Sequence, residues 1–231
     1  MIPIRDKNPS GVIPFVTIGI ILCNALIFLF ELSLGRRLDA LLFQFGVIPI
    51  KVRYAADIPG ATIATTYFPF ISFMFLHGGF IHLIGNMWYL WIFGDNVEDR
   101  LGHFKFIVFY LVCGIGSAAV HVYFNSNSGI PCIGASGAIA GVLGAYMVTF
   151  PRARISVLVP LFVFWQIMEL PAVIVLGFWF LIQFFNGTAA ISSAHGGGVA
   201  WWAHIGGFVF GVILIKLFPG SRRHYVHKTG F

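Results

Sequence analysis

Residues 130–141 read IPCIGASGAIAG and carry one hydroxyl, that of Ser136, among small and apolar side chains. The stretch opens an apolar run that continues to Phe150. Within it, Gly137, Gly141 and Gly144 recur every three or four residues, the pattern that lets two membrane helices approach closely. We therefore expect a tightly packed membrane helix with a serine at its start.

The composition of the whole chain is that of a membrane protein. Of its 231 residues, 58% are hydrophobic and 10% are charged, whereas a soluble domain has roughly 25% charged residues. Because such a chain cannot cover its apolar surface in water, we expect a polytopic protein in a lipid bilayer. The net charge is +6, but the basic residues lie in short clusters between apolar runs, so no nucleic-acid partner is predicted.

Six apolar segments are candidates for membrane spans. A helix needs about 20 residues to cross the hydrocarbon core. Prolines divide the apolar run 155–185, so only the end of this run is expected to span the membrane. The first part is expected to lie along the membrane surface or to re-enter the membrane. The predicted fold is an all-α bundle in one domain, 1–231, with spans at about 13–32, 71–93, 104–124, 136–150, 169–185 and 199–218. Segment 33–70 is too long for a plain connector and is expected to fold in the interface as a first loop.

Basic residues indicate the orientation of the chain. With the N-terminus inside, ten of the 14 Lys and Arg residues fall in inner segments and the other four in segment 33–70. This bias predicts a multi-pass protein of the cell membrane with both termini in the cytoplasm. The first apolar run follows basic residues as a signal peptide would, but it is long and lacks a small-residue cleavage site, so we expect a retained span.

The second, fourth and sixth spans begin on the same side of the membrane, because alternate spans run in the same direction. Each of them starts with costly polar side chains: His82 and Asn86, four apart on one helix face, then Ser136, then His204. The charge bias places these groups in the outer leaflet. The sixth span also repeats small residues, including Gly207, so the fourth and sixth spans are expected to bring Ser136 within hydrogen-bonding reach of His204.

This group of residues would suit acyl transfer. Ser136 would be the nucleophile and His204 the base, since a buried imidazole stays neutral and can accept a proton. The Ser136 backbone N–H at a helix start, with the side chains of His82 and Asn86, would bind an oxyanion. None of the eight acidic residues is expected in this cluster, so the prediction is a Ser–His dyad without a carboxylate.

Other titratable residues are expected to be secondary, and no cofactor or metal is predicted. His77 is expected to brace the first loop, and His195 to be at most a substitute base. Asp95 and Glu98 are expected to tie the turn at the opposite end of the second span. The histidine and cysteine spacings match no metal motif.

Three segments resemble the rhomboid intramembrane serine proteases: GASGAIAG (134–141), AHIGG (203–207) and HGGFIHLIGNMWYLWIFGDNVEDRLG (77–102). The resemblance covers about residues 67–218 and implies a six-helix bundle that cuts single-span transmembrane substrates near the outer leaflet. It implies catalytic roles for Ser136 and His204, and oxyanion-binding roles for His82, Asn86 and the Ser136 backbone. Some members stack the histidine on an aromatic side chain where this chain has Ala140, so Trp201 or Trp202 would have to support His204 instead.

The predicted function is therefore that of a serine endopeptidase, a membrane hydrolase for intramembrane proteolysis. One alternative is a non-catalytic rhomboid-like scaffold that binds transmembrane helices, although such a protein has no need to keep both dyad residues. Another is a small transporter with a histidine proton relay, although no intramembrane carboxylate pair or inverted repeat is visible. The glycine-rich loop 186–198 and the fifth span, including Phe178 and Trp179, are expected to gate the site.

Overall fold

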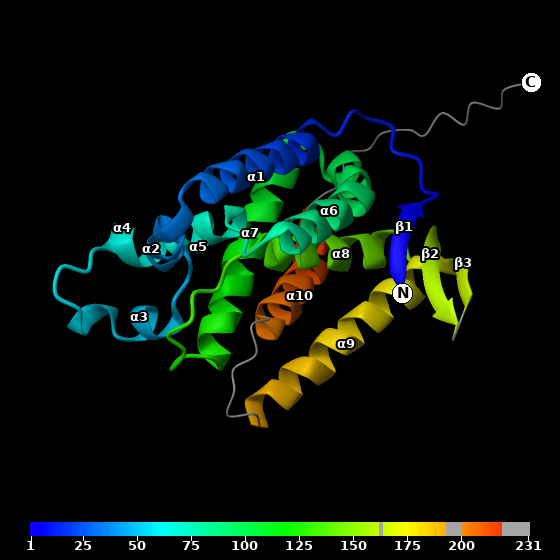
Figure 1. The fold of residues 1–231 in the computed structure, drawn as a ribbon. Coiled ribbons are helices and arrows are strands. Elements are labelled where there is room, and N and C mark those ends of the chain that lie inside the picture. The colour runs from blue at the N-terminus through cyan, green and yellow to red at the C-terminus, as the bar shows by residue number, and fades with distance from the viewer. Residues whose placement is uncertain (162–163, 193–199, 219–231) are drawn as a thin grey trace, which may run out of the picture.

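The computed structural model describes residues 1–161, 164–192 and 200–218. Within these residues, six longer helices and a small sheet make up most of the molecule (Figure 1). The helices are α1 (Phe15–Ser33), α6 (Phe80–Leu101), α7 (His103–Phe124), α8 (Ser136–Thr149), α9 (Ala172–Ser192) and α10 (Trp201–Leu217). The chain is thus mostly helical, with a longer helix in the region of each predicted span.

Length and composition alone identify fewer spans than six among the described residues. Three helices are long and apolar enough to cross a membrane, namely Phe15–Ser33, His103–Phe124 and Ala172–Ala190. A fourth span results if Ile63–Phe75 and Phe80–Leu101, bent by 79°, form one broken span. Helices α8 and α10 are shorter, and the 14 residues of α8 reach only about 21 Å at the usual rise per residue. The count of six spans therefore stays a prediction.

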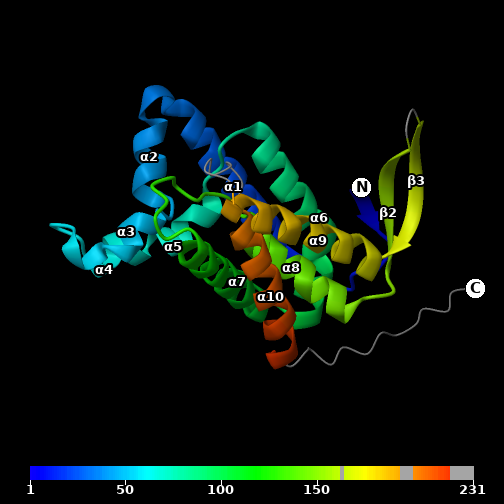
Figure 2. The same cartoon turned by 90° about the horizontal axis from the view of Figure 1, so that it is seen from below.

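Helix α8 is enclosed by the other helices, which explains how it can be short. It lies in the middle of the bundle, in contact with α6, α7, α9 and α10 (Figure 2), and every residue from Gly137 to Tyr146 is buried. A side chain at Gly207 would overlap the carbonyl oxygen of Gly137, and one at Gly211 would overlap that of Gly141. Helices α8 and α10 therefore touch backbone to backbone, which confirms the packing expected from the small residues.

The segment predicted to hug or re-enter the membrane forms β-strands, so the all-α prediction was wrong here. Strand β2 (Arg154–Leu161) pairs antiparallel with β3 (Phe164–Pro171), and its other edge pairs with β1 (Ile2–Asp6). The valine, isoleucine and aromatic residues of this segment favour strands, and β1 completes a three-stranded sheet that is more stable than a lone hairpin. The fifth long helix consequently begins at Ala172, after the strand, instead of near residue 169.

Two predicted connectors also contain helices. Segment 33–70 and the residues after it form the short helices α2 (Leu38–Phe45), α3 (Pro49–Arg53), α4 (Ile63–Tyr67) and α5 (Pro69–Ser72), and three 3₁₀ turns, Gly35–Arg37, Ala55–Asp57 and Phe73–Phe75. Helix α6 starts only at Phe80, after two glycines, later than the predicted start at residue 71. Helix α9 continues to Ser192, so the first part of the predicted loop 186–198 is helical. His195 and Val199 lie outside the described residues.

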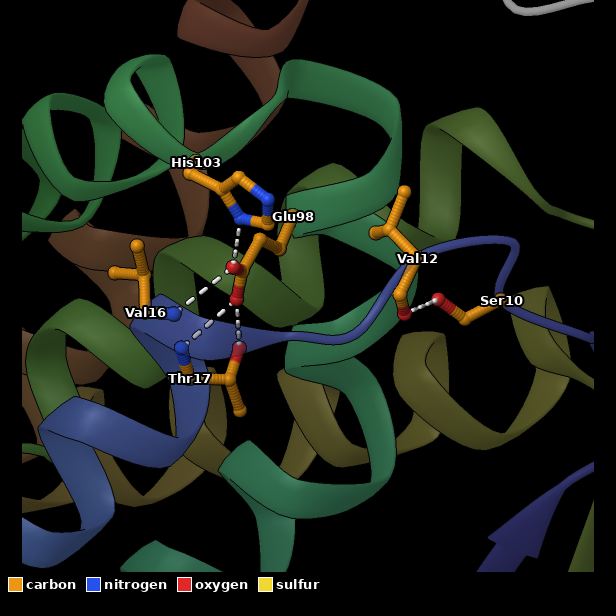
Figure 3. A network of polar contacts seen from close by, with 6 residues as sticks. All are labelled: Ser10, Val12, Val16, Thr17, Glu98 and His103. Atoms are coloured by element: carbon orange, nitrogen blue, oxygen red, sulfur yellow. Dashed lines mark hydrogen bonds and ion pairs between the residues drawn. The ribbon is translucent and has the colours of Figure 1, made fainter.

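A buried carboxylate fixes the start of α1 against the end of α6 (Figure 3). The Glu98 carboxylate accepts hydrogen bonds from the backbone N–H groups of Val16 (2.9 Å) and Thr17 (2.8 Å) and from the Thr17 hydroxyl (2.7 Å). Nδ1 of His103, the first residue of α7, lies 2.6 Å from the same carboxylate. An anion at a helix N-terminus satisfies otherwise unpaired N–H groups. Glu98 thus ties three helices together at the end of α8 away from Ser136.

Candidate active site

Ser136 and His204 meet where α8 and α10 begin. Ser136 is the first residue of α8, and His204 lies one turn into α10. The Ser136 Oγ and the His204 Nε2 are 2.8 Å apart. The close approach of the two helices at Gly137 and Gly207 makes this distance possible. A serine hydroxyl in hydrogen-bonding contact with an imidazole has the geometry in which a serine can act as a nucleophile and a histidine as its base.

The second ring nitrogen of His204 has a partner that the sequence analysis missed. Nδ1 lies 2.8 Å from Oε1 of Gln183, a residue of α9 whose side chain is buried. No spacing rule connects a residue on α9 with one on α10, so the contact could not be read from the sequence. The available signal was the amide side chain of Gln183 in the otherwise apolar run 172–185.

Aromatic rings surround His204 without stacking on it. The Trp201 ring lies 6.3 Å from the imidazole in a T-shaped arrangement, and the Trp179 ring lies 6.0 Å away and is tilted. Trp202, the other support considered, stacks instead on Phe124 with 3.7 Å between the ring centroids. Ala140 is fully buried in the core. The hydrogen bond to Gln183, and not a stacked ring, is therefore the directional contact at Nδ1.

Asn86 and His82 lie beside the dyad on the first turns of α6. They line one cavity of about 330 Å³ together with Ser136 and His204, and Trp179 and Gln183 reach it from α9. Nδ2 of Asn86 is buried and has no hydrogen-bond partner among the described residues. An unpaired buried donor is costly. Its position in this cavity makes it available to an oxygen of a bound molecule.

The loop before α8 leaves room for the His82 ring. Gly134 has a φ of +119°, a backbone conformation that residues with a side chain rarely adopt. A Cβ at this position would lie 2.6 Å from Nε2 of His82. On the other side of the ring, Nδ1 of His82 accepts a long hydrogen bond of 3.4 Å from the Gly78 backbone N–H. The Ser136 backbone N–H belongs to the unpaired first turn of α8, since Ala135 before it has no capping side chain. The predicted oxyanion-binding groups are thus adjacent in space.

A second cavity shares two residues with the first. Its volume is about 250 Å³, and His82 and Ser136 line both cavities. The polar residues His121, Asn125 and Ser128 contribute further to its lining. A cavity of this size with several polar groups in its lining can hold water. Ser136 therefore lies between the first cavity and a space suited to water.

His77 and Glu31 form a second buried polar pair near the site. The backbone N–H of His77 donates to the Glu31 carboxylate at 3.2 Å, and the His77 ring lies 5.1 Å from that of His82. No acidic residue was expected near Ser136, His204, His82 and Asn86. Glu31, at the end of α1, therefore lies closer to these residues than predicted. Over the described ranges, no group of three or more His, Cys, Asp or Glu side chains is placed to hold a metal ion.

Comparison with known proteins identifies relatives of this chain. The family model of the rhomboid domain matches residues 64–220, a range that contains His82, Asn86, Ser136, Gln183 and His204. The presenilin-associated rhomboid-like protein A, mitochondrial, of Danio rerio is 31% identical over 167 residues, which are 70% of this chain and 39% of that protein. The Mus musculus presenilin-associated rhomboid-like protein, mitochondrial, is 29% identical over 184 residues, 75% of this chain and 45% of that protein. RHOMBOID-like protein 6, mitochondrial, of Arabidopsis thaliana is 33% identical over 147 residues, 62% of this chain and 41% of that protein. The chain therefore spans less than half the length of these relatives.

Proposed function

We propose that this chain, which belongs to the rhomboid family, is a serine endopeptidase that cleaves the transmembrane segments of membrane proteins. The observation that carries the proposal is the 2.8 Å separation of Ser136 Oγ and His204 Nε2. Oxyanion donors are available in the same cavity as these two atoms. Together they supply the nucleophile, the base and the oxyanion site that peptide-bond hydrolysis requires.

The proposed reaction begins when His204 Nε2 takes the proton of the Ser136 hydroxyl while Oγ attacks the scissile carbonyl carbon. The oxygen of that carbonyl becomes an oxyanion, which receives hydrogen bonds from Asn86 Nδ2, His82 and the Ser136 backbone N–H. The tetrahedral intermediate collapses, the C–N bond breaks, and the imidazolium of His204 gives its proton to the leaving amine. An acyl ester on Ser136 remains.

Hydrolysis of the acyl ester needs water beside Ser136. A water molecule from the second cavity, next to His82 and Ser136, would lose a proton to His204 as its oxygen attacks the ester carbonyl. The C–O bond to Ser136 then breaks, and Oγ recovers the proton from His204. The polar residues in the lining of this cavity support its role as a water source in a protein that is surrounded by lipid.

The proposed substrates are single-span proteins with small or helix-weakening residues near the outer face of the membrane. An intact helix hides its carbonyl groups in backbone hydrogen bonds, so a cleavable segment has to unwind. Trp179 and Gln183 line the first cavity from α9, and Ile81, Gly85 and Tyr89 line it from α6. We place substrate entry between α6 and α9. A disulfide crosslink between the two helices would then stop cleavage, and an unchanged rate would contradict this route.

The number of membrane spans and the orientation of the chain in the membrane are part of the same proposal. The chain would form one membrane domain of six spans, with segment 33–70 in the interface and both termini in the cytoplasm of a cell-membrane protein. The charge bias of the loops supports this orientation. The names of the three relatives place those proteins in mitochondria. Accessibility labelling of single cysteines placed at residues 8 and 35, which precede and follow α1, shows on which side of the membrane each residue lies. The measurement works in a cell membrane and in a mitochondrial membrane.

The proposal is tested with the purified protein in liposomes that contain a candidate single-span substrate. Mass spectrometry of the products maps the cut, and the Ser136→Ala variant shows whether the cut depends on the serine. A fluorophosphonate probe provides a second readout, since it labels an activated serine. Substrate binding without cleavage or labelling would contradict the protease and favour the scaffold.

A further inference from the structure

We propose that Gln183 is the positioning residue of the dyad: its side-chain oxygen accepts a hydrogen bond from Nδ1–H of His204 and so selects the tautomer that can act as a base. This inference rests on the proposed function. The observation behind it is the 2.8 Å separation of Gln183 Oε1 and His204 Nδ1, opposite the 2.8 Å contact of Nε2 with Ser136. The two contacts lie at the two nitrogens of one ring.

A neutral imidazole carries one proton, and its place decides the chemistry. If Nδ1 carries it, Nε2 has a lone pair that can take the Ser136 proton. If Nε2 carries it, the ring can only donate to Ser136, and the serine is not activated. An acceptor at Nδ1 therefore stabilises the reactive tautomer. In the proteases with a Ser–His–Asp triad a carboxylate has this task.

An amide suits this place better than a carboxylate would. The Gln183 side chain is 6% exposed in a helix rich in apolar residues, and an unpaired charge there would be costly. A neutral acceptor orients the ring without that cost. The hydrogen bond also compensates for Ala140, which offers no ring for the imidazole to stack on.

The backbone around α9 holds the acceptor in place. The start of α9 is anchored by hydrogen bonds from the Ala172 N–H to the Ala153 carbonyl (2.9 Å) and from the Val173 N–H to the Pro151 carbonyl (3.1 Å). From there α9 packs against α8 and α10. The nucleophile, the base and the acceptor thus come from three different helices.

Two substitutions separate the acceptor from the bulk of the side chain. Gln183→Leu keeps a similar volume but removes the acceptor, and Gln183→Glu keeps an acceptor at the same reach. We expect kcat of Gln183→Leu to fall about 10- to 100-fold with little change in KM, because one orienting hydrogen bond is lost. Gln183→Glu should retain more activity than Gln183→Leu. The neighbouring Ile182, which is 40% exposed, gives a control in Ile182→Ala that should cleave at the wild-type rate.

Wild-type kcat in Gln183→Leu would overturn the proposal, and so would a Gln183→Glu variant that is folded but as slow as Gln183→Leu. Thermal unfolding in detergent identifies variants that fail to fold. A second readout does not need activity: ¹⁵N NMR of the His204 ring in a Ser136→Ala background. We expect a protonated Nδ1 with Gln183 present and a shift towards protonated Nε2 in Gln183→Leu. An unchanged tautomer would refute the positioning role, whereas a wild-type protein that cuts nothing would refute only the proposed function.

Discussion

The carbonyl oxygen of Gly137 on α8 lies directly against Gly207 on α10, with no space for a side chain at Gly207. Ser136 precedes the first glycine, and His204 lies one turn before the second. The separation of the two backbones therefore sets the separation of the Ser136 and His204 side chains. Any residue that pushes the helices apart lengthens the 2.8 Å contact between Ser136 Oγ and His204 Nε2.

Gly207→Ala is expected to destabilise the protein and to reduce cleavage. The added methyl group has to displace backbone atoms of α8, and overpacking of this kind costs about 1–3 kcal/mol. Thermal unfolding in detergent and a cleavage assay measure the two effects. Gly19→Ala in α1 is the control, since a Cβ there has nothing within 4 Å. Equal stability of the two variants would contradict the close packing.

Ser136→Ala and His204→Ala should each lower the cleavage rate by at least about 10³-fold while the protein stays folded. The reason is that the Ser136 hydroxyl is a poor nucleophile without a base, and the His204 imidazole has no nucleophile to activate without the serine. Ser136→Ala should also abolish fluorophosphonate labelling. Ser33→Ala, at the exposed end of α1, should leave cleavage and labelling intact. Residual cleavage near the wild-type level in either dyad variant would argue for a different nucleophile or base.

Asn86→Ala should lower kcat by roughly 10²–10³-fold, the usual effect of removing one oxyanion donor. KM should change little, because the hydrogen bond strengthens as the oxyanion forms. Stability should not fall, since Nδ2 of Asn86 has no hydrogen-bond partner among the described residues. Steady-state kinetics in liposomes provide the measurement. A variant with a raised KM and normal kcat would instead indicate a role in substrate binding.

Glu98→Ala is expected to destabilise the protein by about 1–3 kcal/mol through the loss of buried hydrogen bonds to the start of α1. Chemical denaturation with a lipid-compatible denaturant gives the free energy of unfolding. Asp99→Ala is a suitable comparison, because its carboxylate accepts one hydrogen bond, from the Gly11 N–H, in an exposed position. We expect the Asp99 variant to lose clearly less stability. The reverse order would rule out the capping role of Glu98.

Lys7 and Glu169 form an ion pair across the sheet, and this pair gives a pH-dependent prediction. The hydrogen bond from the Lys7 ammonium holds the pKa of the Glu169 carboxyl below its usual value. The stabilising contribution of the ion pair is therefore fully present above the ordinary pKa of glutamate, and it is lost as the pH falls through the lowered pKa of Glu169. Lys7→Gln should raise the pKa of Glu169, which a ¹³C NMR titration detects. Because both side chains are half-exposed, the Lys7→Gln substitution should change the free energy of unfolding little.

The positions of most residues of the candidate site could be predicted from the sequence, because these residues lie near the starts of helices that run in the same direction. Their polar character within apolar runs marked His82, Asn86, Ser136 and His204, and the glycine spacing predicted which helices touch. The segment before α9 was misjudged, since an apolar run interrupted by prolines does not distinguish a membrane-hugging helix from strands. Its strand partner, β1, lies more than 140 residues away in the chain.

The sequence by itself determined the membrane environment, the approximate region of each longer helix and the polar residues Ser136, His204, His82 and Asn86 near helix starts, because these depend on local composition and on spacing along one helix. Tertiary structure alone decided that Gln183 meets Nδ1 of His204, that Nδ2 of Asn86 has no partner within the described part of the chain and that the N-terminal strand joins the sheet. These contacts join residues from separate elements. Such contacts depend on how the elements pack, and no local pattern encodes that packing.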